Sequence, residues 1–139
     1  MRVVVDTNVI IAAIRSLRGA SAHLLAAIEL GKVEMLVSVP LMMEYEQVCK
    51  RSEHRAGLLK TESAVDAFLD GLAARATPVI VRYNWRPQLN DAGDEMVLET
   101  AINGVADAII TFNTRHFGAA AHFGIELAQP GDLLRRISS

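Results

Sequence analysis

The sequence is poor in the residues and segments that define several classes of protein. It has a single cysteine, Cys49, so an internal disulfide and a cysteine-rich zinc site are both excluded. No stretch approaches the roughly 18 apolar residues that a membrane span requires. The amino terminus also lacks a signal-peptide core, because Asp6 interrupts its apolar run. We therefore expect a cytoplasmic protein with no membrane segment.

An excess of positive charge is missing as well. Lys and Arg total 14 against 16 Asp and Glu, which gives a net charge of −2. That balance excludes a protein that holds nucleic acid simply by being basic. If the protein acts on a polyanion, another source of positive charge has to neutralise it.

The composition that remains is that of a globular domain. The 139 residues are 51% hydrophobic and 22% charged, and no linker or internal repeat divides them. Short apolar runs alternate with helical patterns, which is typical of parallel strands joined by helices. We predict strands at residues 2–5, 33–37, 78–83, 108–112 and 125–127, and helices at 9–14, 22–30, 40–50, 61–75, 94–103 and 131–137. The sequence thus predicts one α/β domain over residues 1–139, a parallel sheet of four to five strands with helices on both faces.

Three carboxylates fall where strand ends and helix starts should meet. Asp6 follows the first strand, Glu44 borders the apolar face of its helix, and Asp94 lies near the middle of an apolar stripe. Ligands of open parallel sheets bind outside the carboxyl ends of the strands. Carboxylates that converge there need a cation, and Mg²⁺ or Mn²⁺ prefers oxygen ligands. This pattern predicts metal-dependent chemistry on phosphate esters, since a bound ion activates water and offsets phosphoryl charge.

Each acid also has a purely structural explanation. Asp6 could do no more than cap the next helix, and the Glu44 carboxylate could simply reach water at the edge of its helix. Asp94 could be the reciprocal partner of a cap at Asp91. Other kinds of site have less support, because the histidines lack zinc spacing and no phosphate-binding glycine loop or nucleophile elbow occurs.

The same segments resemble PIN domains, block by block and in the same order. Residues 3–10 (VVVDTNVI) look like the opening of the family, and residues 38–48 (SVPLMMEYEQV) resemble its glutamate-bearing helix. Residues 90–101 (NDAGDEMVLETA) resemble the segment with its third acid, and residues 106–117 (ADAIITFNTRHF) its following strand and turn. Residues 125–130 and the last helix are similar to its end. The nearest resemblance is to the prokaryotic toxin-type, VapC-like ribonucleases.

The resemblance implies a Mg²⁺- or Mn²⁺-dependent ribonuclease that cleaves RNA. It places Asp6, Glu44 and Asp94 on the three core acidic positions, as catalytic residues and metal ligands. Asn113 stands where many members have a fourth acid, and because it adds no negative charge it leaves open whether one or two ions bind. The residues expected to contact substrate, or to orient the acids and the water, are Thr7, Asn8, Thr111, Arg15 and Arg115. Arg18 and the group Lys50, Arg51 and Arg55 are further candidates for phosphate contacts.

The resemblance also implies partners. Many toxin-type members are homodimers, and many are paired with an antitoxin protein. Two other functions are compatible with the same residues: a PIN-fold interaction module with weak or no catalysis, and a metal-dependent phosphatase that acts on small esters.

Overall fold

Five parallel strands form the central sheet of the computed structural model, which describes residues 1–51, 61–82, 89 and 91–137. They are β1 (Arg2–Val5), β2 (Glu34–Ser38), β3 (Thr77–Val79), β4 (Ala108–Ile110) and β5 (Glu126–Ala128). Their order across the sheet is β3-β2-β1-β4-β5, and every pair is parallel. The predicted α/β fold with a parallel sheet is confirmed.

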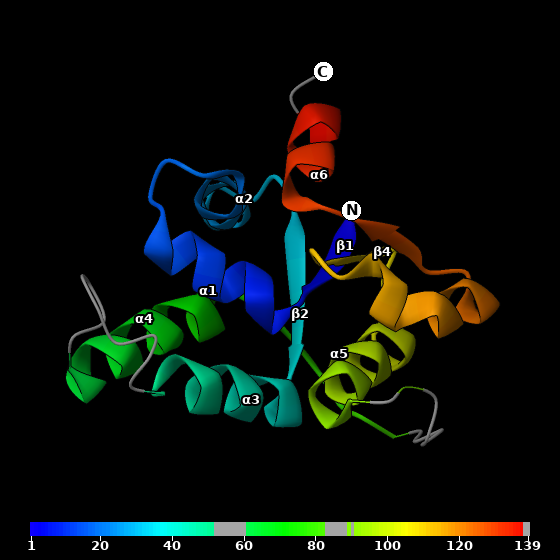
Figure 1. Ribbon diagram of the computed structural model, residues 1–139, viewed down its shortest axis with the longest axis horizontal. Helices are drawn as coiled ribbons and strands as arrows, with labels where there is room; N and C mark the ends of the chain where they lie inside the picture. The colour runs from blue at the N-terminus through cyan, green and yellow to red at the C-terminus, as the bar shows by residue number, and fades with distance from the viewer. Residues whose placement is uncertain (52–60, 83–88, 90, 138–139) are drawn as a thin grey trace.

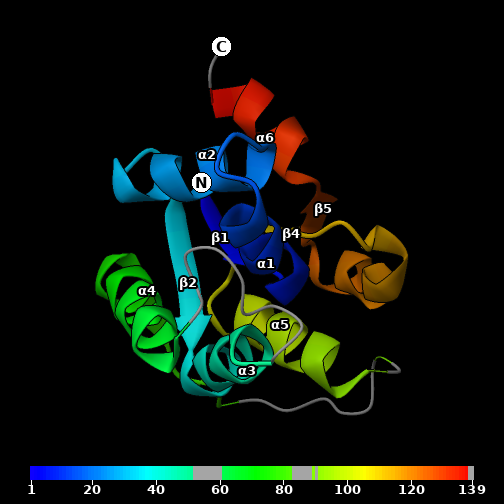
Figure 2. The same cartoon turned by 60° about the vertical axis from the view of Figure 1, so that its left-hand side comes forward.

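Seven helices in the described part of the chain flank this sheet. They are α1 (Thr7–Arg15), α2 (Ala20–Glu29), α3 (Val39–Cys49), α4 (Glu62–Arg75), α5 (Ala92–Asn103), the 3-10 helix η3 (Thr114–Phe123) and α6 (Pro130–Ile137). In Figure 1, α1 to α4 lie to the left of β2, whereas α5 and η3 lie to its right. Figure 2 shows α2 and α6 side by side near the amino terminus, where they contact each other. The helices therefore cover both faces of the sheet, as the sequence predicts.

Buried contacts fix α3 and α5 at the carboxyl edge of the sheet. The central strands β1 and β4 are almost fully buried, and the hydroxyl of Tyr45 on α3 donates to the backbone carbonyl of Val5. The hydroxyls of Ser38 and Thr100 lie 2.7 Å apart and join the start of α3 to α5. Paired buried polar groups of this kind hold neighbouring elements in one relative position, because breaking the pair leaves an unsatisfied group. Side chains on α3 and α5 are thus placed on rigid supports.

The direction of the chain across the sheet reverses between β1 and β4. The chain moves from β1 to β2 and β3 on one side, and then crosses to β4 and β5 on the other. Such a switch point opens a crevice outside the carboxyl ends of the two strands, which is where open α/β sheets bind ligands. Asp6 follows β1 and Thr111 follows β4, so these two residues flank that crevice.

Some element boundaries differ from the sequence prediction. The third strand spans residues 77–79 instead of 78–83, because this edge strand pairs only with β2, which ends at Ser38 opposite Val79. Residues 114–123 form the unpredicted helix η3. In the described part of the chain no single helix is long and apolar enough to cross a membrane, and the one pair that reaches this length together, α1 with α2, is bent by 103°.

Val105 has an unfavourable backbone conformation that a substitution can relieve. Its φ is 52° and its side chain is 74% exposed, so packing offers little compensation. The left-handed conformation costs an ordinary residue about 1–2 kcal/mol, whereas Asn tolerates it. We expect Val105→Asn to raise the free energy of unfolding by about 1 kcal/mol in a urea titration. Val39→Asn, at another exposed valine but within α3, should give no such gain, and equal effects at both sites would contradict this explanation.

Candidate active site

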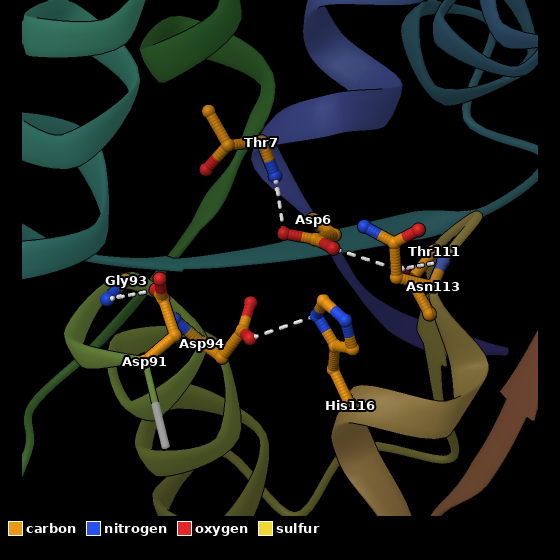
Figure 3. A network of polar contacts seen from close by, with 8 residues as sticks. All are labelled: Asp6, Thr7, Asp91, Gly93, Asp94, Thr111, Asn113 and His116. Carbon is orange, nitrogen blue, oxygen red and sulfur yellow. Dashed lines mark hydrogen bonds and ion pairs between the residues drawn. The ribbon is translucent and has the colours of Figure 1, made fainter. Parts of the chain in front are cut away.

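Asp6 is held at the junction of β1, α1 and β4. It is the N-cap of α1, and its backbone N–H donates to the carbonyl oxygen of Ile110 at 2.9 Å. Its Oδ1 accepts from the backbone N–H of Thr7 at 2.7 Å, and its Oδ2 accepts from the Thr111 hydroxyl at 2.6 Å (Figure 3). The capping explanation is therefore correct but incomplete, because the same carboxylate also borders the crevice at the switch point.

Thr111 supports Asp6 from behind. Its side chain is fully buried, and its hydroxyl also accepts from the backbone N–H of Asn113 at 2.9 Å. Because its hydroxyl is buried against Asp6 and the turn after β4, we assign Thr111 to orienting these groups, which is one of the two roles expected for it from the sequence. Asn113 itself is exposed at the crevice.

Asp94 lies in the first turn of α5 and points toward Asp6 and His116 (Figure 3). Its Oδ2 is 3.2 Å from Nδ1 of His116, and its side chain is only 15% exposed. Asp91 is the cap of α5, accepting from the backbone N–H groups of Gly93 at 2.8 Å and Asp94 at 3.1 Å. The Asp94 carboxylate therefore faces the crevice, and Asp91 provides the side-chain cap of α5.

Burial and neighbouring negative charge disfavour the ionised form of both aspartates. Burial raises the pKa of Asp6, although the hydrogen bonds from Thr111 and Thr7 act in the opposite direction. Burial, Asp6 and Asp91 together raise the pKa of Asp94 to about 6, and His116 opposes this shift. A cation bound between such carboxyl groups would favour their ionised forms.

Glu44 approaches the same place from α3. It is half-buried, and a β-carbon at position 93 would lie 2.9 Å from its Oε1 and 3.0 Å from Oδ1 of Asp91. The glycine at this position therefore leaves the space in which the Glu44 carboxylate meets the start of α5.

A cavity of about 710 Å³ joins these groups. Among the residues that line it are Asp6, Glu44, Asp94, Asn113, Thr7, Asn8 and Arg15. The structure thus brings together the three predicted acids, Asn113 and three of the five predicted contact residues. Arg115 lies outside this cavity and lines a neighbouring one of about 380 Å³.

The four additional basic residues, which were candidates for phosphate contacts, differ in their positions. Arg51 lines the main cavity, whereas Lys50 is ion-paired with Glu46 at 3.0 Å and with Asp66 at 2.9 Å. Arg18 is exposed and does not line this cavity, and Arg55 lies outside the described residues.

Sequence reasoning missed His116. The histidines lack zinc spacing in the sequence, but His116 lines the cavity and contacts Asp94. The sequence does contain one signal for it. His116 is three residues after Asn113, and both residues follow the carboxyl end of β4.

The donor set fits a hard divalent cation bound partly through water. Within the described residues no three Asp, Glu, His or Cys side chains are close enough to hold an ion alone. Mg²⁺ does not need such a group, because it keeps several waters and takes one or two carboxylates. Asp6 and Asp94 supply two carboxylates that repel each other, and the buried Oδ1 of Asn8, which has no hydrogen-bond partner in the described chain, can accept from a water.

Fold and site together define an α/β protein with an acidic cavity at the switch point of its sheet. A family model described as PIN domain matches residues 2–115, and the chain belongs to the PIN domain family. PIN domains are generally nucleases. The matched range includes Asp6, Glu44, Asp94 and Asn113. No curated protein matches the chain.

Proposed function

We propose that this PIN domain is a divalent-metal-dependent ribonuclease that hydrolyses RNA phosphodiester bonds. The observation that carries the proposal is the convergence of Asp6, Glu44 and Asp94, with Asn113, on one cavity at the switch point. The family adds support, since PIN domains usually use Mg²⁺ or Mn²⁺. A resident cation also answers the question raised by the net charge of −2, because it supplies the positive charge that a polyanionic substrate requires.

The residues of the cavity have distinct tasks in this proposal. Asp6 and Asp94 hold the ion, and Asp6 is kept in place by Thr7 and Thr111. When bound, the ion lowers the pKa of a water ligand and offsets charge on the phosphate. Glu44, whose carboxylate lies beside Gly93 at the start of α5, orients the attacking water, and the Asn113 amide positions water or substrate.

Cations at the edge of the cavity would contact phosphates on either side of the scissile bond. Arg15 at the end of α1 and Arg51 just beyond α3 line the cavity itself. Arg115 lines the neighbouring cavity, which also contains Asp91, Asp94 and His116. A strand of RNA that passes from one cavity to the other would meet Arg15 and Arg51 at one end and Arg115 at the other.

We extend the proposal to the biological role that the toxin-type resemblance suggests. The protein would act in the cytoplasm as the toxin of a toxin–antitoxin pair, as a homodimer, and would be neutralised by its antitoxin. A small DNA-binding protein encoded by the adjacent reading frame supports this role if its co-expression suppresses RNA cleavage. Size-exclusion chromatography with light scattering measures the oligomeric state.

The central test is cleavage of labelled RNA by purified protein with and without Mg²⁺ or Mn²⁺. We expect cleavage only when the ion is present, and a rise in melting temperature on adding Mn²⁺, because binding to the folded state stabilises it. Metal-independent cleavage contradicts the proposal. Absence of both cleavage and metal-dependent stabilisation favours the interaction module, and faster turnover of a chromogenic phosphomonoester than of RNA favours the phosphatase.

A further inference from the structure

Phe112 is an apolar ring at the edge of the acidic cavity. It immediately follows the buried Thr111, lines the same cavity as Asp6 and Arg15, and is 42% exposed. Within the described residues it is the one aromatic side chain among the large exposed hydrophobic ones. What sets Phe112 apart from the other exposed hydrophobic residues is that it is aromatic and lines the acidic cavity.

The backbone around Phe112 is fixed relative to the acids. On one side of it, the backbone N–H of Thr111 donates to the carbonyl oxygen of Ala128 at 2.9 Å, and the Thr111 hydroxyl donates to Asp6. On the other side, the backbone N–H of Asn113 donates to the same hydroxyl at 2.9 Å. Phe112 is therefore the corner of a short turn whose backbone is anchored to Asp6, and its side chain lines the same cavity as the expected metal ligands.

The two kinds of group on this cavity match the two parts of a nucleotide. Asp6 and Asp94, through a bound ion, together with Arg15 and Arg51, suit a phosphate. An aromatic ring suits a nucleobase, because every base has a π-face on which it can stack. Inorganic phosphate and aliphatic phosphate esters have no π-face that could stack on the ring.

We propose that Phe112 is a nucleobase-stacking residue that binds the base adjacent to the scissile phosphate. The proposal rests on the proposed ribonuclease function and adds to it a specificity-determining contact. The base on Phe112 has to leave its own stack, so the enzyme takes a nucleotide that is already unstacked, in a single strand or a bulge. Since every base offers a π-face, the ring itself selects an unstacked conformation and not a sequence.

The test combines substitutions at Phe112 with removal of single bases from the RNA. Binding of labelled 12-nucleotide single strands is measured by fluorescence anisotropy in an Asp94→Asn background, which prevents cleavage. Each strand carries one abasic nucleotide, at a different position in each. Phe112→Ala should weaken binding of the complete strand by about 5- to 150-fold, the range found for loss of one base–aromatic stack. At one position, an abasic nucleotide should weaken binding to the unmodified ring by the same factor as Phe112→Ala weakens binding of the complete strand. For that abasic strand, Phe112→Ala should cause no further loss of affinity.

Other variants separate stacking from apolar contact and from misfolding. Phe112→Trp should keep the affinity, whereas Phe112→Leu, which is apolar but has no ring, should lose it. Leu30→Ala, at an exposed leucine at the end of α2 that does not line the cavity, is the matched control and should bind normally. Melting temperatures of all variants show whether they fold. A folded Phe112→Leu with unchanged affinity overturns the proposal.

Cleavage assays distinguish failure of this inference from failure of the ribonuclease proposal. If the unmodified protein cleaves RNA with Mn²⁺, and Phe112→Ala cleaves with the same KM, stacking is wrong and the ribonuclease stands. If KM rises 5- to 150-fold with little change in kcat, both stand. If the unmodified protein binds RNA through Phe112 but does not cleave it, the ribonuclease proposal fails and stacking stands. If it neither binds nor cleaves, both are wrong.

Discussion

Asp94→Asn should reduce metal-dependent RNA cleavage by about 100-fold or more and at the same time make the metal-free protein more stable. The expected loss follows from the role of Asp94 as a metal ligand, since even the residues that support such ligands contribute about 10- to 100-fold. The gain in stability follows from its surroundings, because burial, Asp6 and Asp91 disfavour its charge. Asparagine has nearly the same shape and removes that charge. Cleavage of labelled RNA and the melting temperature without added cation measure the two effects.

The gain should depend on pH in a defined direction. The pKa of Asp94 is raised in the folded protein to about 6 from an ordinary value of 3.8. Between these values the unfolded chain loses its proton more readily than the folded one, so the contribution of Asp94 to stability falls as pH rises. The stability difference between Asp94→Asn and the unmodified protein should therefore be small below pH 4, grow up to about pH 6, and stay constant above it.

Two controls test this explanation. Asp70→Asn removes an exposed acid from α4 and should change neither activity nor the pH dependence of stability. Added Mn²⁺ should stabilise the unmodified protein and have much less effect on Asp94→Asn, which reverses the order of their stabilities if binding is strong enough. A variant that remains fully active, or that is less stable than the unmodified protein without cation at pH 8, would contradict the role given to Asp94.

Asp6→Ala should abolish the same activity but destabilise the protein. It removes the acceptor for the Thr7 N–H at the start of α1 and the acceptor for the buried Thr111 hydroxyl. Loss of an N-cap costs about 0.5–2 kcal/mol, and an unpaired buried hydroxyl adds to this, while removal of the buried charge offsets part of it. We expect a net loss of about 1–2 kcal/mol in a urea titration. Substitutions of two aspartates in one cavity, Asp94→Asn and Asp6→Ala, would thus change the free energy of unfolding in opposite directions.

Asp6→Asn and Thr111→Val separate the two roles of Asp6. Asparagine keeps an oxygen for the Thr7 N–H, so Asp6→Asn should retain most of the stability and still be inactive. Thr111→Val keeps the shape of the buried side chain and removes the hydroxyl that orients Asp6. We expect it to fold with reduced Mn²⁺ affinity, as measured by isothermal titration calorimetry. An active Asp6→Asn would show that the carboxylate is only a helix cap.

Local patterns in the sequence were sufficient for the fold. The alternation of apolar runs with helical segments predicts parallel strands, because a strand buried on both faces must be apolar throughout, as Val3 to Val5 are. The same reasoning places Asp6 at the end of β1, since the first charged residue after a buried run ends the strand. How many residues of a strand pair with its neighbour depends on that neighbour and not on the local sequence. The prediction for the edge strand β3 is therefore too long, because β3 pairs with β2 over only three residues.

The site was predicted only in part for the same reason. Asp6, Glu44 and Asp94 each interrupt an apolar pattern, so the sequence marks them one by one. Whether they meet depends on the order of the strands and on the buried contacts that fix α3 and α5, such as Tyr45 with Val5. The sequence by itself determined which carboxylates are out of place on apolar faces, because that is a matter of neighbours along the chain.

Only the tertiary structure decided what surrounds those carboxylates. Thr111 is behind Asp6 and not in front of it, His116 reaches Asp94, and Arg115 belongs to a neighbouring cavity. These relations join distant parts of the chain: Asp6 and Thr111 are separated by 105 positions, and His116 of η3 contacts Asp94 on α5. The physical reason is that side chains meet through the packing of strand ends and helix starts, whose distances in space are not encoded by their spacing in the sequence.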